Sequence, residues 1–229
     1  MAKRRYKWTR FTGSLKGRGR LRDIHNRLRY GAGAPRYAEL IWVDPSSIKT
    51  ALVLPAPVAR YGSGRVVRQF PDASVAPRVP VQDIDKIAAC LEHFSGGVSW
   101  HQTRFIRSHA VELADRMGWS RSVAVDFLVN RFSCYDDLYE QIKTEGQMRT
   151  RQELRRRNFR EEGGVVVHLG PDGELFYGKC GNRRFAIALA LGLRTIPAIP
   201  GYVHVDSLSR LAELRVRSLK TSAESRYEA

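Results

Sequence analysis

Residues 164–203 constrain the fold more than any other part of the sequence. Two runs rich in β-branched and aromatic residues, GVVVHL and ELFYG, flank Gly-Pro-Asp-Gly, in which proline fixes φ and glycine accepts a positive φ. These runs predict a β-hairpin. An Ala-rich helix over 182–191 and a strand beginning at Ile196 follow, so the segment predicts a β-turn-β-loop-helix-β module.

The residues at the start of the predicted helix are candidates for binding an anion. Its sequence, GKCGNRRF, places Gly181 where the backbone can approach a ligand closely, Asn182 at the N-cap, and Arg183 and Arg184 directly after it. Unpaired N–H groups and the helix dipole favour an anion there, and the forked guanidinium donors match phosphate oxygens. Adjacent arginines cannot share one helical face, so one can grip the anion while the other pairs with an acid. The alternative is an ordinary capped helix with surface arginines.

The same residues carry a resemblance to a known family. The order G-x-R-R-aromatic, a short Ala-rich helix and then G-L-x-x-I-P is similar to the signature of the ParB/sulfiredoxin superfamily, whose ParB members read Gly-Glu-Arg-Arg-Trp-Arg-Ala-Ala followed by Ala-Gly-Leu-x-x-Ile-Pro. The segment YDDLYEQIKTEGQ, residues 135–147, resembles the upstream box of that family. The resemblance covers about residues 135–203, and it implies that the predicted strand over residues 37–48 supplies the first strand of that fold.

The resemblance implies a nucleotide site. ParB-like members bind CTP, some relatives are ATP- or ADP-dependent kinases, and sulfiredoxins use ATP. It therefore implies CTP or ATP with Mg²⁺ as the cofactor, held through its phosphates by Gly181, Asn182, Arg183 and Arg184. Asn182 stands where ParB proteins often have Glu and sulfiredoxins have the reactive Cys, while Cys180 lies two residues earlier. This difference favours binding over hydrolysis or reductase chemistry.

Phosphoryl transfer would need a metal ligand and a base as well. Glu140 is the candidate catalytic residue, because it lies one turn from Asp136 and Asp137 on the predicted helix of the upstream box. A solvent-exposed helix carboxylate is the alternative interpretation of Glu140. The sequence leaves open whether the protein is an enzyme.

Residues 1–36 hold much of the chain's positive charge. They contain twelve basic residues and one acid, a net +11 within a total of +16. Interleaved glycines and few apolar residues predict a flexible arm with a short helix near residues 22–30. Interspersed aromatic residues favour nucleic-acid binding over a solubilising tail. The candidate nucleic-acid contacts in this arm are Arg4, Arg5, Lys7, Arg10, Arg18 and Arg20.

Two further segments offer nucleic-acid contacts. Residues 109–132 have the spacing of a helix-turn-helix, with a turn at Gly118, a cap at Ser120 and Arg121 at the start of the second helix. A plain helical hairpin has the same spacing. The run RTRQELRRRNFR contributes Arg155 and Arg156 to a phosphate-facing ridge or to a solvated charged face.

The sequence predicts an α/β fold: a ParB/sulfiredoxin-like mixed sheet with flanking helices over 37–205, a helical insertion at about 83–132, and a C-terminal helix or tail over 206–229. Scattered cysteines and histidines show no metal-site spacing. No apolar run has the length of a membrane span or signal peptide, so we expect a cytoplasmic protein without a membrane partner.

We expect a phosphate- or nucleotide-binding domain that acts on or beside nucleic acid. The alternatives are a small-molecule kinase or NTPase of the same fold, and a non-catalytic basic protein that docks in a larger assembly. The sequence does not decide between DNA and RNA, and it gives no oligomeric state.

Overall fold

The structure is a computed structural model of the 229-residue chain, and it describes residues 17–54 and 63–215. The strands are β1 (Ile41–Val43), β2 (Thr50–Leu52), β3 (Arg65–Val67), β4 (Arg78–Pro80), β5 (Val165–Leu169), β6 (Leu175–Tyr177) and β7 (Ile196–His204). The α-helices are α3 (Asp85–Phe94), α4 (Arg104–Met117), α5 (Arg121–Glu145), α6 (Arg151–Leu154) and α7 (Asn182–Ala190). Residues 17–30 and 208–215 are also helical.

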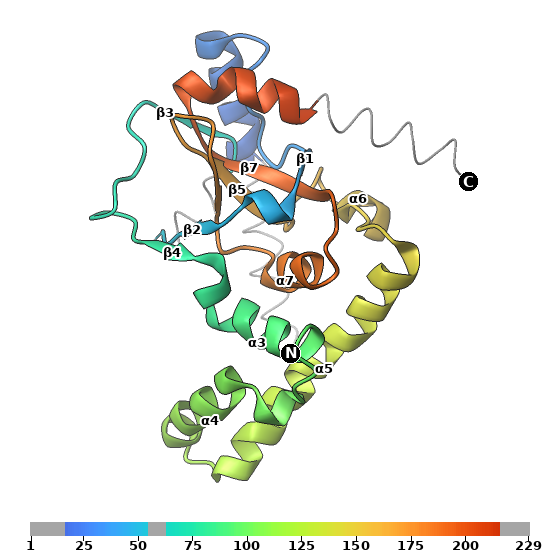
Figure 1. Cartoon of the computed structure of the whole chain (residues 1–229). Helices are drawn as coiled ribbons and strands as arrows, with labels where there is room; N and C mark the ends of the chain where they lie inside the picture. The colour runs from blue at the N-terminus through green and yellow to red at the C-terminus, as the bar shows by residue number, and fades with distance from the viewer. Residues whose placement is uncertain (1–16, 55–62, 216–229) are drawn as a thin grey trace.

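The strands form one mixed sheet in the order β1-β7-β5-β6-β2-β4, with β3 paired to β7. The pairs β5/β7, β2/β6 and β3/β7 are parallel, whereas β1/β7, β5/β6 and β2/β4 are antiparallel. Helices pack around this sheet (Figure 1). The predicted α/β class with a mixed sheet is therefore confirmed.

The predicted module over residues 164–203 is present. The β5–β6 hairpin closes through a hydrogen bond from the Gly170 N–H to the Glu174 carbonyl at 2.9 Å, and Gly173 adopts the positive φ of 76°. Helix α7 and strand β7 follow, within one residue of the predicted boundaries. Because β7 pairs with β1, β3 and β5, the module forms the centre of the sheet.

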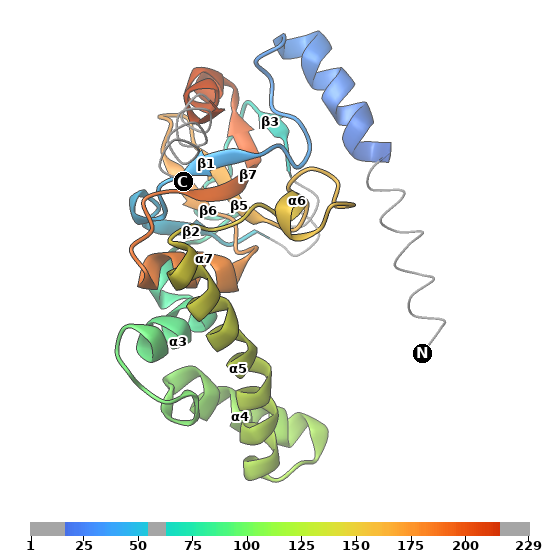
Figure 2. The same cartoon turned by 90° about the vertical axis from the view of Figure 1, so that its right-hand side faces the viewer.

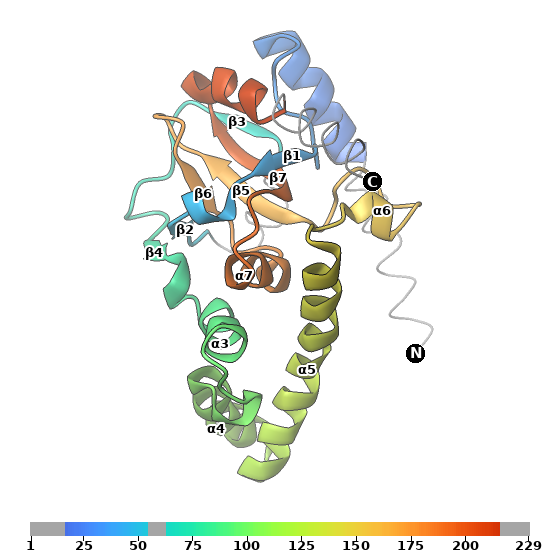
Figure 3. The same cartoon turned by 45° about the vertical axis from the view of Figure 1, so that its right-hand side comes forward.

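Helix α7 joins the sheet to a helical lobe. Phe185 and Ile187 of α7 pack with Val165 and Val167 of β5 in the main core, and all four are fully buried. Helix α3 packs on α7, and α4 packs on α5. Figures 1 and 3 show α3, α4 and the first half of α5 extending from α7, at the opposite end of the molecule from residues 17–30.

Helix α5 differs from the prediction of two helices that divide near residue 133. It runs without interruption for 25 residues and ends at Gly146, which has a positive φ of 65°. The predicted boundary contains no glycine or proline to end a helix, and the Ser133 and Cys134 side chains donate to carbonyls three residues earlier. The predicted insertion therefore has no boundary at residue 132.

In two other segments the structure contains elements that the prediction did not specify. The loop-rich connection between residues 55 and 80 contains the short strands β3 and β4, and residues 55–62 lie outside the described residues. In the predicted C-terminal helix or tail, residues 208–215 are helical and the remaining residues are not described. The short strands have three residues each, too few to show a hydrophobic period.

The short helix expected near residues 22–30 is present and extends over residues 17–30, whereas residues 1–16 of the predicted arm lie outside the described residues. The helix of residues 17–30 is docked on the sheet domain through Asn26, which is only 3% exposed. The Asn26 amide donates to the carbonyls of Pro35 at 2.8 Å and Gly64 at 2.7 Å. Polar anchoring of this kind leaves no hydrophobic signal in a sequence.

Replacing Asn26 tests this docking. Asn26→Ala leaves two buried carbonyl groups without a donor, so we expect the free energy of unfolding to fall by about 2 kcal/mol. Urea denaturation measures the change. His25→Ala, at the exposed neighbouring position, is the control and should change stability by less than about 0.5 kcal/mol. Equal effects of the two substitutions would show that the helix is not docked as described.

Candidate functional site

The loop between β6 and α7 is fixed against strand β5. The Gly178 N–H donates to the Val166 carbonyl at 2.9 Å, and the Val166 N–H donates to the Cys180 carbonyl at 3.4 Å. Gly181 has a φ of 79°, and a Cβ there would lie 3.0 Å from the Val165 Cα. Only glycine therefore satisfies both the backbone conformation and the close approach to β5.

Gly181, rather than Asn182, is the N-cap of α7. Asn182 is the first helical residue, and its Oδ1 accepts a hydrogen bond from the Tyr177 hydroxyl. The Tyr177 ring is fully buried and stacks on Phe185 with centroids 4.4 Å apart. Burial raises the pKa of the Tyr177 hydroxyl well above its usual value, so Tyr177 stays a hydrogen-bond donor. Asn182 thus anchors the helix start instead of capping it.

The first turn of α7 has the properties of an anion-binding site. An α-helix supplies no acceptor for its first N–H groups, which here belong to Asn182, Arg183 and Arg184, and its dipole makes this end positive. No acidic side chain lies in the turn. Lys179, exposed and with a positive φ of 55°, adds a cation in the preceding loop. We call Lys179 and residues 181–183 the α7 site.

Arg183 is the exposed arginine of the α7 site. Its guanidinium carbon lies 4.9 Å from the centroid of the Tyr135 ring, and its Nη1 lies 3.5 Å from Cys134 Sγ on the same helix, α5. It forms no ion pair with any residue in the described part of the chain. Arg183 is therefore positioned by α5 while its charge is not neutralised by a carboxylate.

The Arg184 side chain does not point to the α7 site, although its N–H lies in the first turn of α7. Its side chain is buried, its Nη2 donates to the Arg149 carbonyl, and its Nη1 lies 3.6 Å from Glu161 Oε1. The expectation that one of the two arginines pairs with an acid is therefore met, and Glu161 is the acid. In place of the predicted phosphate contact, the Arg184 side chain contacts Glu161 and the Arg149 carbonyl within the protein.

The contact between Arg184 and Glu161 is an incompletely satisfied buried ion pair. Neither Arg184 Nη1 nor Glu161 Oε1 has a hydrogen-bond partner among the described residues. Burial raises the pKa of Glu161 and lowers the pKa of Arg184 to about 10. The other oxygen, Glu161 Oε2, accepts from the Arg151 N–H at 2.7 Å. Glu161 thus joins the start of α7 to the start of α6.

The structure does not bring Glu140 to the α7 site. Glu140 follows Tyr135 by five residues on α5, which places it about 140° around the helix axis from the side that contacts Arg183. Its side chain is 65% exposed, and its carboxylate lies 3.7 Å from Lys143 Nζ. The geometry matches the alternative interpretation, a solvent-exposed helix carboxylate.

The candidate nucleic-acid contacts lie in several places. Arg18 and Arg20 are on the helix formed by residues 17–30, and Arg155 and Arg156 follow α6. Arg121 begins α5 at the far end of the helical lobe (Figure 2). Arg4, Arg5, Lys7 and Arg10 lie outside the described residues. The structure therefore separates Arg121 from the other described candidates.

The segment with helix-turn-helix spacing is a packed helical pair. Gly118 ends α4 with a φ of 66°, and Ser120 Oγ accepts from the Val123 N–H at 3.3 Å. Ala114 and Ala124 are buried between the helices. A depression of about 570 Å³ beside this pair is lined by three arginines, Arg104, Arg107 and Arg121, together with Glu92, Val98, Gln102 and Ser108.

Sequence reasoning missed three of the side chains around the α7 site: Lys179, Cys134 and Tyr135. The two glycines that flank the Lys-Cys pair are a sequence signal for Lys179. Nothing in the sequence marks Cys134 and Tyr135, because their contact with Arg183 depends on how α5 packs.

Within residues 17–54 and 63–215, no group of three or more His, Cys, Asp or Glu side chains is arranged to hold a metal ion. Over the same residues, no helix has both the length and the apolar character needed to cross a membrane.

Comparison with known proteins found no match to this chain among protein-family models, curated proteins or solved structures. Its function must therefore be inferred from the site itself.

A double-mutant cycle tests the buried ion pair. Arg184→Met leaves the Glu161 carboxylate buried without its cation, so we expect a loss of about 3 kcal/mol in the free energy of unfolding. Glu161→Gln in the Arg184→Met background should recover part of that loss, giving a coupling energy of about 2 kcal/mol by urea denaturation. Strictly additive effects would contradict the pairing.

Proposed function

We propose that the protein is a ParB/sulfiredoxin-like phosphate- or nucleotide-binding protein that acts on or beside nucleic acid. The observation that carries the proposal is the first turn of α7. It presents N–H groups and Arg183, which has no ion pair among the described residues, but no carboxylate. Cations at a helix N-terminus are unfavourable beside the positive end of the dipole. A bound anion removes that repulsion.

The backbone of the α7 site supports a phosphate ligand. Gly181 lets the chain approach without a side chain, and the loop is fixed to β5 by backbone hydrogen bonds. A preformed loop of this kind needs little ordering when a ligand binds. The expected ligand is CTP or ATP with Mg²⁺, in which the metal neutralises part of the phosphate charge.

The residues of the α7 site favour binding over chemistry. The Asn182 side-chain oxygen, Oδ1, accepts from the Tyr177 hydroxyl, and Glu140 lies on a different side of α5 from the residue that contacts Arg183. We therefore propose a binding protein and assign no catalytic residue. The net charge of +16 favours a nucleic-acid partner, and the cytoplasm is the expected location.

A thermal-shift series with CTP, ATP, ADP and inorganic pyrophosphate tests this proposal. A ligand at about a hundredfold excess over its Kd stabilises the folded state by about 2.7 kcal/mol, so Tm should rise by about 5–10 °C. Arg183→Ala should abolish most of that rise, because it removes the unpaired guanidinium.

Arg194→Ala is the matched control. It removes the same charge from the other end of α7, where Arg194 is exposed, and should leave the rise in Tm unchanged. Absence of a shift with every ligand would refute the proposed site. An equal loss of the Tm rise in both variants would indicate that the ligand responds to the overall charge of the protein and not to the α7 site.

A further inference from the structure

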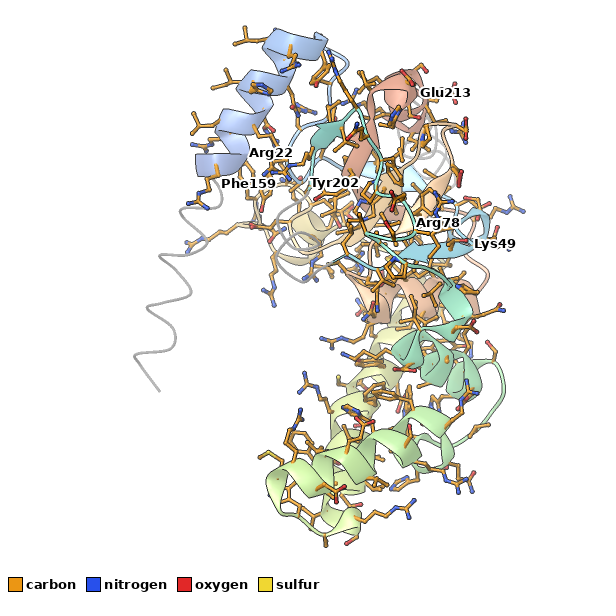
Figure 4. The ribbon with its side chains drawn as sticks, turned by 90° about the vertical axis from the view of Figure 1, so that its left-hand side faces the viewer. Arg22, Lys49, Arg78, Phe159, Tyr202 and Glu213 are labelled. Carbon is orange, nitrogen blue, oxygen red and sulfur yellow. The ribbon has the colours of Figure 1, made fainter. Side chains whose placement is uncertain are left out.

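Two segments far apart in the sequence meet on one surface. The Arg20 guanidinium carbon, on the helix of residues 17–30, lies 5.8 Å from the centroid of the Phe159 ring, and that of Arg160 lies 5.0 Å from the same centroid. Arg160 Nη1 also lies 2.7 Å from Asp23 Oδ2 on the helix. Figures 2 and 3 show α6 and the loop after it next to one end of this helix, and Figure 4 shows Phe159 at the same place.

The two segments together carry six arginines near this junction. We call this group the arginine surface, and its members are Arg20, Arg27, Arg155, Arg156, Arg157 and Arg160. The first five are exposed, and none of them forms an ion pair with a residue that the structure describes. Beside Arg27 and Arg160 the surface is hollowed into a depression of about 510 Å³ that Arg36 also lines. Asp23 and Glu39 line this depression too, where they pair with Arg160 and Arg36, so the charge without an internal partner among the described residues is that of the other five arginines.

The carboxylates of these elements have partners within the protein. Asp23 accepts from the Tyr37 N–H and from Arg160. Glu153 accepts from the Thr150 N–H in the capping box of α6, and Glu162 accepts from the Tyr37 hydroxyl at 3.0 Å. Glu161, in the same loop, is buried and pairs with Arg184. Four carboxylates beside six guanidinium groups leave a net positive charge.

We propose that the arginine surface binds the phosphate backbone of double-stranded nucleic acid. Guanidinium groups match phosphate oxygens with paired donors, and backbone contacts of this kind need no base sequence. Unpaired strands need exposed aromatic rings on which bases stack. Phe159 is instead covered by Arg20 and Arg160 and stacked on Tyr37, with centroids 6.1 Å apart.

The inference rests on the proposed function for its partner class, but it uses a surface separate from the α7 site. The helix of residues 17–30 also exposes Leu21, Ile24 and Leu28. An amphipathic basic helix can bind anionic lipid, so anionic vesicles are the competing partner in the test.

The experiment measures binding of the full chain to a short random-sequence DNA duplex by fluorescence anisotropy across a salt series. The variant Arg155→Ala/Arg156→Ala/Arg157→Ala should weaken duplex binding about tenfold or more. The slope of log K against log salt should become less steep by about 0.9 for each phosphate that the variant no longer neutralises. Arg20→Ala/Arg27→Ala, which removes two arginines from the helix of residues 17–30, should also weaken duplex binding.

The control removes the same charge elsewhere. Arg104→Ala/Arg107→Ala/Arg121→Ala takes three exposed arginines from the helical lobe and should leave duplex affinity within about twofold. Loss of binding in this variant alone would move the duplex site to the helical lobe. Equal loss in both triple variants would mean that only net charge matters. Either result overturns the inference.

Two further measurements distinguish the duplex from a single strand and from a lipid surface as the partner. The single strand of the same sequence should bind more weakly than the duplex, and phosphatidylglycerol vesicles should not compete at equal phosphate concentration. A preference for the single strand, or binding to vesicles without binding to the duplex, would overturn the inference. Arg183→Ala should keep duplex affinity, so failure of nucleotide binding is distinguishable from failure here.

Discussion

The buried contact between Arg184 and Glu161 holds together the parts of the molecule on which both proposed sites depend. Arg184 lies in the first turn of α7, and Glu161 accepts from the first N–H of α6 and donates its own N–H to the Ala38 carbonyl at 3.0 Å. Arg184 also donates to the Arg149 carbonyl, so the contact links α7, the segment between α5 and α6, and the loop after α6. An ion pair this deeply buried gains little net stability and chiefly sets geometry.

This arrangement divides the roles of two adjacent arginines. Arg184 faces inward and positions the helix start, whereas Arg183 faces α5 and keeps an unneutralised charge beside the first-turn N–H groups. The loop after α6, fixed by Glu161, carries Arg155, Arg156 and Arg157 to the arginine surface. A nucleotide and a duplex could thus be bound by one protein through different elements.

Much of the fold was predictable from local signals. The hairpin turn, the α7 boundaries and the stop of α5 at Gly146 follow from glycine and proline chemistry and from hydrophobic period. The docking of residues 17–30 was not predictable from the sequence. It depends on Asn26 and other polar contacts, which leave no hydrophobic period. The sequence also could not assign Arg183 and Arg184 their separate roles, since Glu161 lies more than twenty residues away. Sequence spacing could not decide between the two interpretations of Glu140, because it does not show which face of α5 packs.

The most direct test of the α7 site is an amide NMR titration of the full chain with inorganic pyrophosphate. The N–H resonances of Asn182, Arg183 and Arg184 should shift together and saturate, because these groups would donate to the bound anion. Unchanged resonances at these three positions, with shifts confined to the arginine surface, would contradict the assignment of an anion-binding site to α7.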